Sequence, residues 1–167
     1  MNHYTLVGVD PGIVHTGVVA LTLQPVERRV TVDSRIIYGA DINSLVISVR
    51  AIAPVWSRMY VEGYRDRGTV NQMNNKMRVF EQEIRREWRK AQILENMGVK
   101  KIVTTPMMKA FGVWKMPHTN HRDLQAAARI ALFGAIKQKD QPELNRIIYE
   151  YLTDYRGGRP WQLDIIR

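Results

Sequence analysis

The sequence predicts an α/β protein with a mixed central sheet, in which further strands extend a three-stranded antiparallel meander and helices flank the sheet. Three apolar, β-branched segments follow one another near the start of the chain with short links, which is typical of a meander. Helix-like and strand-like segments then alternate, as they do where helices join parallel strands. One mixed sheet accounts for both observations.

The meander is expected within the first 38 residues. Residues 4–9 have the apolar and β-branched composition of a central strand. Pro11-Gly12 supplies a tight turn, and residues 15–23 return as a second strand. Residues 30–38 have the same character and complete the three strands.

The middle of the chain is expected to alternate between helices and strands. The elements are, in order, a helix over 41–53, a strand over 58–62, a helix over 69–97 and a strand over 101–104. Asp41 or Asn43 is suited to cap the first helix, and Pro54 ends it. The long helix has apolar residues every three or four positions, and Gly98 is a suitable stop.

The last third is expected to be mostly helical. Its parts are a basic loop with aromatic residues over 105–121, an alanine-rich helix over 123–137, a helix over 142–151 and a flexible tail over 156–167. Pro142 suits the first position of a helix. A chain of 167 residues suffices for one core, so a single domain is expected over 1–155.

Composition favours a partner with many negative charges. The chain has 25 Lys and Arg against 16 Asp and Glu, a formal charge of +9, and no cysteine. Nucleic acid is the first choice, although a solvated basic surface would give the same balance. Disulfides and cysteine-based zinc sites are excluded. We find no signal peptide, basic amphipathic anchor or apolar run of about 20 residues, so a cytoplasmic protein without a membrane partner is expected.

Three acids occupy positions typical of a metal site that faces phosphates. Asp10 and Glu62 each end an expected apolar strand, and Asp123 opens the alanine-rich helix. If the two strands are neighbours, these carboxylates converge, as a magnesium site for phosphoryl transfer requires. Two alternatives stay open, because Asp10 also suits a turn before Pro-Gly and Asp123 also suits a helix cap.

The three runs that contain these acids resemble motifs of the RuvC-type Holliday-junction resolvases. Residues 7–12, VGVDPG, followed by TG at 16–17, resemble the first acidic strand of that family. Residues 60–62, YVE, resemble its second acidic strand, and residues 123–132, DLQAAARIAL, its last acidic motif. Other RNase H-like folds and actin-like ATPases share the first motif, whereas the three in this order are more specific. The resemblance covers residues 4–136, and the short length and divergent sequence of the chain are similar to those of a phage branch of the family.

The resemblance implies an RNase H-like fold, a homodimer, and cleavage of symmetric strands at a four-way DNA junction with Mg²⁺ or Mn²⁺, two ions per site. Asp10, Glu62 and Asp123 would be the catalytic residues and metal ligands. The partners would be four-way and other branched DNA, met in the bacterial cytoplasm if a phage encodes the protein. The alternative is a non-cleaving protein of this fold that binds branched DNA. An actin-like kinase would need a second phosphate loop and more chain.

Ala126 is the departure from the family pattern. The pattern has a carboxylate at this place, on the same helix face one turn after Asp123. Our hypothesis is that the chain is an inactivated variant, with alanine in place of a catalytic aspartate at 126. Natural drift to alanine is one alternative. The other is a shift of the alignment that makes Asp123 the second acid of the motif.

Several residues near the acids are candidates for binding DNA. Lysines neutralise phosphates and rings stack on unpaired bases. The candidates are Tyr64, Arg65, Arg67, Lys109, Trp114, Lys115 and His121. Lys109 would also have a catalytic role in stabilising charge in the transition state, and His118 or His121 could move a proton. The alternatives are core packing for Trp114, a surface ring for Tyr64 and structural or exposed side chains for the histidines.

Overall fold

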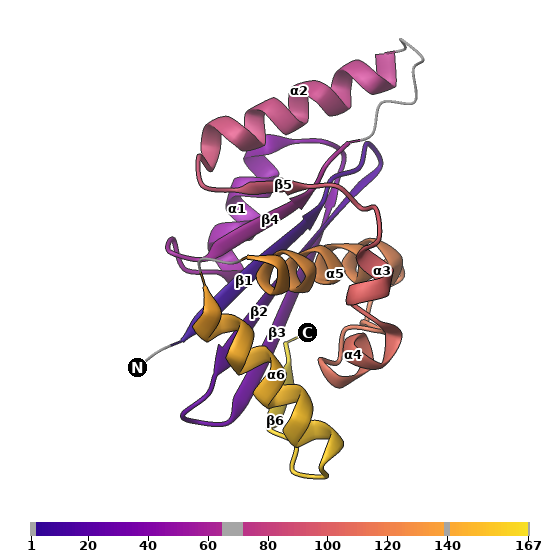
Figure 1. Cartoon of the computed structure of the whole chain (residues 1–167). Helices are drawn as coiled ribbons and strands as arrows, with labels where there is room; N and C mark the ends of the chain where they lie inside the picture. Colours follow the sequence, from indigo (N-terminus) through magenta and orange to yellow (C-terminus); the bar gives the residue numbers. More distant parts are fainter. Residues whose placement is uncertain (1–2, 65–71, 139–140, 167) are drawn as a thin grey trace.

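A six-stranded mixed sheet forms the centre of the molecule (Figure 1). The structure is a computed structural model, and it describes residues 3–64, 72–138 and 141–166. The strands lie in the order β5-β4-β1-β2-β3-β6. Their bounds are β1 Tyr4–Asp10, β2 His15–Gln24, β3 Arg29–Tyr38, β4 Arg58–Glu62, β5 Gln92–Leu94 and β6 Gln162–Ile165.

Helices cover both faces of this sheet. Their bounds are α1 Ile42–Ile52, α2 Gln72–Glu87, α3 Val99–Ile102, α4 Thr105–Ala110, α5 His121–Lys137 and α6 Pro142–Arg156. The helices α3 to α6 share a core with one face, and α1 and α2 share a core with the other. Among the described residues, no helix has the length and apolar character needed to cross a membrane.

The strands β1, β2 and β3 form the predicted antiparallel meander. Successive side chains of a strand point to opposite faces. In β1, Leu6 is buried in the core that includes α5, whereas Val7 and Val9 are buried in the core that includes α1. Asp10 therefore belongs to the α5 side of the sheet, the side of Leu6.

The strand β4 adds to β1 in parallel, with Val9 opposite Val61. It ends at Glu62, as predicted, and β5 pairs with its other edge. The parallel pairing brings the carboxyl ends of β1 and β4 to the same end of the sheet. In an α/β sheet this is the end where sites form.

The segment after α2 differs from the prediction. The expected helix over 69–97 ends at Glu87, and residues 92–94 form β5 instead. Ile93 lies opposite Val61, so hydrogen bonding to the open edge of β4 outweighs helix propensity there. Residues 101–104 were expected to form a strand, but β5 occupies that edge and Val99–Ile102 is a short helix. The expected loop over 105–121 begins with the helix α4.

The C-terminal segment is not the flexible tail that the sequence predicts. Residues 162–165 form β6, which pairs in parallel with β3. Trp161 is buried, and its Nε1 donates to Asp154 Oδ2 at 2.9 Å. Arg28 forms an ion pair with the same carboxylate at 3.1 Å. The glycines at 157–158 form a turn that returns the chain to the sheet.

Candidate active site

The sheet brings Asp10 and Glu62 together. Val9 pairs with Val61 in parallel, so the next residue of each strand is Asp10 or Glu62, and the two carboxylates end neighbouring strands. Two positions earlier, Tyr60 faces α5, because its ring lies where a Cβ of Gly134 would be. Glu62 shares that face of β4. Both acids therefore lie on the α5 side of the sheet.

Two glycines let α5 approach this sheet closely and so position Asp123. A Cβ on Gly8 would lie 1.8 Å from the Ala127 carbonyl oxygen, and one on Gly17 would lie 2.5 Å from the Asp123 carbonyl oxygen. Gly17 is also the partner of Asp10 in the β1–β2 ladder. The first turn of α5 thus rests on the residue beside Asp10. Asn120 is the N-cap residue, and Asp123 is the acidic residue of this first turn, where it also interacts favourably with the helix dipole.

The pKa of Asp10 depends on its burial and on both other acids. Burial raises the pKa of Asp10, and the Glu62 carboxylate raises it further through charge repulsion and a shared hydrogen bond. The charge of Asp123 adds to this, and the pKa of Asp10 reaches about 8. A cation would relieve the repulsion among these groups.

Carboxylate oxygens are ligands that Mg²⁺ prefers, although the side chains here do not supply a complete set of ligands. Within the described ranges, no three His, Asp or Glu side chains are grouped closely enough to hold a metal ion. Asp10 and Glu62 are nevertheless in contact, and Mg²⁺ is usually bound by one or two carboxylates together with substrate phosphates and water. The residues present therefore fit such an ion, with Asp123 close by.

Ala126 and Arg129 lie on α5 after Asp123. Ala126 is half-exposed, three residues on, so it shares a helix face with Asp123. Burial lowers the pKa of Arg129, and the charge of Glu62 offsets part of that fall. Within the part of the chain that the structure describes, the Arg129 Nε is buried without a hydrogen-bond partner. The helix thus presents a cation near Glu62, and a methyl group at the place of the expected acid.

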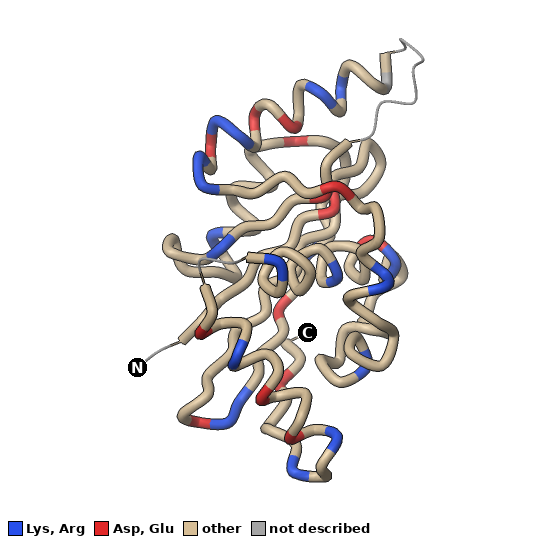
Figure 2. Tube along the Cα trace, in the orientation of Figure 1, with Lys and Arg blue, Asp and Glu red and all other residues tan. Residues whose placement is uncertain are grey.

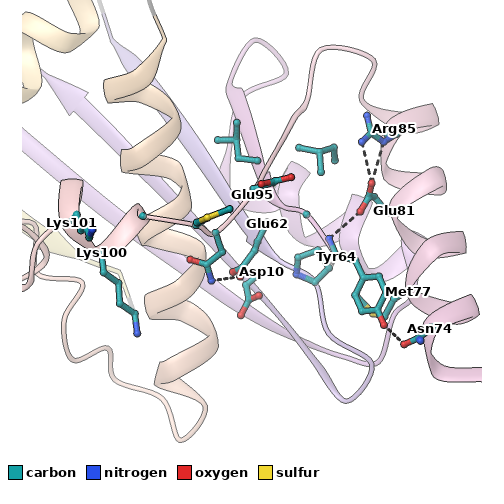
Figure 3. Close-up of a pocket in the computed structure, with 17 residues that line it drawn as sticks. Asp10, Glu62, Tyr64, Asn74, Met77, Glu81, Arg85, Glu95, Lys100 and Lys101 are labelled. Carbon is teal, nitrogen blue, oxygen red and sulfur yellow. Dashed lines mark hydrogen bonds and ion pairs between the residues drawn. The ribbon is translucent and has the colours of Figure 1, made fainter. Parts of the chain in front are cut away.

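A cleft of about 1130 Å³ opens over the carboxylates. In Figure 3, Lys100 and Lys101 lie on one side of Asp10 and Glu62, and Tyr64 lies on the other side beside α2. The cleft has carboxylates at its bottom and cations at its rim. This arrangement suits a polymer with repeated phosphate groups, because the lysines can bind some phosphates while another reaches the acids.

Two side chains lining this cleft are held in place by hydrogen bonds. The Asn96 amide donates to Glu62 Oε1. The Tyr64 backbone N–H donates to Glu81 Oε2 at 3.1 Å, and its hydroxyl bonds to Asn74 Oδ1. Glu81 in turn pairs with Arg85 at 3.1 Å. Glu62 and Tyr64 are therefore oriented before any ligand binds.

The other candidates for DNA binding lie further from this cleft or outside the description. Lys109 and Lys115 are exposed on and after α4, and neither lines the cleft. Trp114 is partly buried against the core, which favours the packing alternative. His121 is the first residue of α5. Arg65 and Arg67 fall outside the described residues.

Sequence reasoning missed Lys100, Lys101 and Asn96 as parts of the site. The expected strand over 101–104 placed Lys101 in the sheet, whereas both lysines lie on the short helix α3. The available signal is their position two and three residues after the Gly98 stop, where a new short element can present cations. Asn96 had no such signal, because its role depends on how β5 pairs with β4.

Comparison with solved structures identifies the fold. A structure described as T. thermophilus RuvC in complex with Holliday junction substrate matches with a TM-score of 0.56 and 14% sequence identity. The match covers 95% of this chain and 98% of that chain. A second, Thermus thermophilus RuvC, has a TM-score of 0.48 and 16% identity, covering 78% of this chain and 93% of the other. No protein-family model and no curated protein matches the sequence. The chain therefore has a RuvC-like variant of the RNase H-like fold, with its acids at the end of β1 and β4.

Proposed function

We propose that this chain is a single nuclease domain that cuts branched DNA, four-way junctions foremost, by metal-dependent phosphodiester hydrolysis. The observation that carries the proposal is that Asp10 and Glu62 end neighbouring parallel strands on the face of a RuvC-like sheet that α5 covers, with Asp123 in the first turn of that helix. The charge of +9 supports a nucleic-acid partner. The RuvC structure of similar fold holds a Holliday junction substrate, which supports the choice of a branched one.

In this proposal the metal site is formed by Asp10 and Glu62, with Asp123 as the third acid. Bound Mg²⁺ or Mn²⁺, with two ions per site, would activate water and stabilise charge on the phosphate oxygens. Asn96 orients the Glu62 carboxylate. Lys100 and Lys101 would neutralise phosphates at the rim of the cleft, and Tyr64 would stack on a base at the branch point.

A homodimer and a phage origin belong to the same proposal. A four-way junction has two-fold symmetry, so a two-fold dimer would place two sites on opposite strands. The short length of the chain and its departures from the family pattern, such as Ala126, are the basis for proposing a phage branch that acts in the bacterial cytoplasm.

The second candidate is a protein that binds branched DNA without cutting it, and Ala126 is the observation that favours it. A methyl group one turn after Asp123 removes a ligand from the α5 side of the site. Arg129 adds a fixed positive charge near Glu62, which would attract a phosphate whether or not a metal is bound. Under the inactivated-variant hypothesis the chain binds branched DNA without cutting it, as in the second candidate. Restoring an acid at 126 would then restore the cutting of the first candidate.

The test compares the chain with its Ala126→Asp variant on a labelled four-way junction and on a linear duplex of the same sequence, with and without Mg²⁺. We expect the chain to bind the junction more tightly than the duplex, and Ala126→Asp to nick the junction only with Mg²⁺. The control is Ala126→Asn, which has nearly the same volume without the charge.

Each outcome decides between the candidates. Nicking by the unaltered chain supports the nuclease and contradicts the inactivated-variant hypothesis. Nicking by Ala126→Asp, but not by the unaltered chain or by Ala126→Asn, supports the nuclease and that hypothesis together. Selective binding without nicking by any variant supports the non-cleaving protein. Equal affinity for junction and duplex contradicts both.

A further inference from the structure

A second cavity lies at the opposite end of β4 from the carboxylates. It has a volume of about 790 Å³, within the range of small-ligand sites, and lies where β4 and β5 begin and α2 ends. Because β4 runs from Arg58 to Glu62 at about 3.3 Å per residue, the two sites are separated by roughly 13 Å of strand. This cavity has no part in the proposed cleavage site.

Positive charge dominates the lining of this cavity. Its cations come from the start of β4 and from the end of α2 and the turn after it (Figure 2). They are Arg58, Arg86, Arg89 and Lys90. None of these forms an ion pair with another described residue, and the acid that lines the cavity, Glu87, pairs with Arg50 at 3.4 Å. The cations are thus available to an anionic ligand.

Two tryptophans lie among these cations. The Trp56 side chain is exposed, with 74% of its surface accessible, and Trp88 is partly buried against the core of α1 and α2. The turn that carries Trp56 is fixed, because Ser57 donates to the Pro54 carbonyl from its N–H at 3.0 Å and from its hydroxyl at 2.6 Å. The turn fixes the backbone from which the exposed Trp56 ring projects, which lowers the entropy cost of presenting that ring as a stacking surface.

We propose that this cavity is a second nucleic-acid site, which binds a segment of single-stranded DNA. Rings stack on unpaired bases, and nearby Arg and Lys follow the phosphates. A duplex keeps its bases stacked inside and would leave Trp56 unused. The carboxylates of an acidic peptide would pair with the cations of the cavity, but they would likewise leave the exposed Trp56 ring in water. The site would hold an unpaired strand of a branched substrate away from the cleft, and its existence does not depend on cleavage.

The test uses the full chain and a fluorescently labelled oligo(dT). Anisotropy measures its affinity at several salt concentrations, and tryptophan emission reports stacking. We expect Trp56→Ala to weaken binding about tenfold, and Trp56→Phe to retain most of the affinity. Arg89→Ala should lower the slope of log K against log salt by about 0.7. The matched control is Arg156→Ala, an equal loss of charge at the end of α6.

Two further readouts separate this site from the cleft. Oligo(dT) should quench the emission of the unaltered chain more than that of Trp56→Phe. Lys100→Ala, which removes a cation from the cleft, should show the full quenching. The proposal is overturned if quenching is the same with and without Trp56. It is also overturned if poly-glutamate binding depends on Arg89 while oligo(dT) binding does not, since the ligand would then be an acidic protein. Circular dichroism melts verify that each variant folds.

Discussion

Replacing Gly17 by alanine tests how the site is assembled. Gly17 lies opposite Asp10 and beneath the first turn of α5. A Cβ at this position would be 2.5 Å from the Asp123 carbonyl oxygen and 2.6 Å from its carbonyl carbon. Non-bonded heavy atoms are at their optimum near about 3.5 Å, so the first turn of α5 has to move by roughly 1 Å.

This displacement should affect both stability and the site. Overpacking of this kind costs about 1–3 kcal/mol of the free energy of unfolding, which urea denaturation followed by circular dichroism measures. Moving Asp123 by roughly 1 Å should also weaken metal-dependent chemistry about a hundredfold. That loss is measured as the rate of nicking in the Ala126→Asp background, and calorimetry measures separately how far Mn²⁺ affinity falls.

Gly157→Ala is the matched control. A Cβ at Gly157 meets the Thr153 carbonyl oxygen at 3.3 Å, and the residue has a φ of −78°, so alanine should cost less than about 0.5 kcal/mol. If Gly17→Ala is as stable as Gly157→Ala and binds Mn²⁺ normally, α5 does not rest on Gly17 and our account of how Asp123 is placed is wrong.

Three other substitutions test separate parts of the structure. Asn96→Ala should lower Mn²⁺ affinity about tenfold without changing the urea midpoint, because the amide orients Glu62, and unchanged affinity would contradict that role. Tyr151→Phe should cost about 1–3 kcal/mol in urea unfolding, because the Ala110 carbonyl loses its buried hydroxyl donor, and a change below the error would show that water replaces it. The Trp161 N–H, then Arg28 and Arg159, lower the pKa of Asp154. Its carboxylate therefore stabilises the fold above about pH 4, and that contribution is lost as pH falls through the lower folded pKa. Asp154→Asn should be less stable at neutral pH and less sensitive to acid, and parallel pH profiles in urea unfolding would contradict this.

The local pattern of the sequence was sufficient where an element follows its own periodicity. The meander, α1 with Asp41 as its N-cap, β4 and α5 all lie close to their expected bounds. Asp10 and Glu62 could be predicted to meet, because each ends an apolar strand and parallel neighbours share an end. Asp123 was a candidate because it opens the alanine-rich helix, and the resemblance to RuvC-type motifs then favoured it as a metal ligand over a helix cap.

The rest depends on contacts between distant segments, which local pattern does not contain. The sequence pattern of the β5 residues predicts a helix, but these residues pair with the free edge of β4 instead. The same pairing brings Asn96 to Glu62. The tail becomes β6 because Trp161 finds a buried partner in Asp154. The cavity beside Trp56 needs α2 to end next to the start of β4.

The central claim is that Asp10 and Glu62, with Asp123 beside them, bind the metal ions of a nuclease. The most direct measurement is anomalous diffraction from crystals soaked in Mn²⁺, for the chain and for Ala126→Asp. We predict a peak in contact with the Asp10 and Glu62 carboxylates in both, with stronger occupancy in the variant, where the introduced carboxylate becomes a further ligand. No peak between Asp10 and Glu62 in either crystal, at Mn²⁺ concentrations that support nicking by RuvC-type enzymes, would contradict the account.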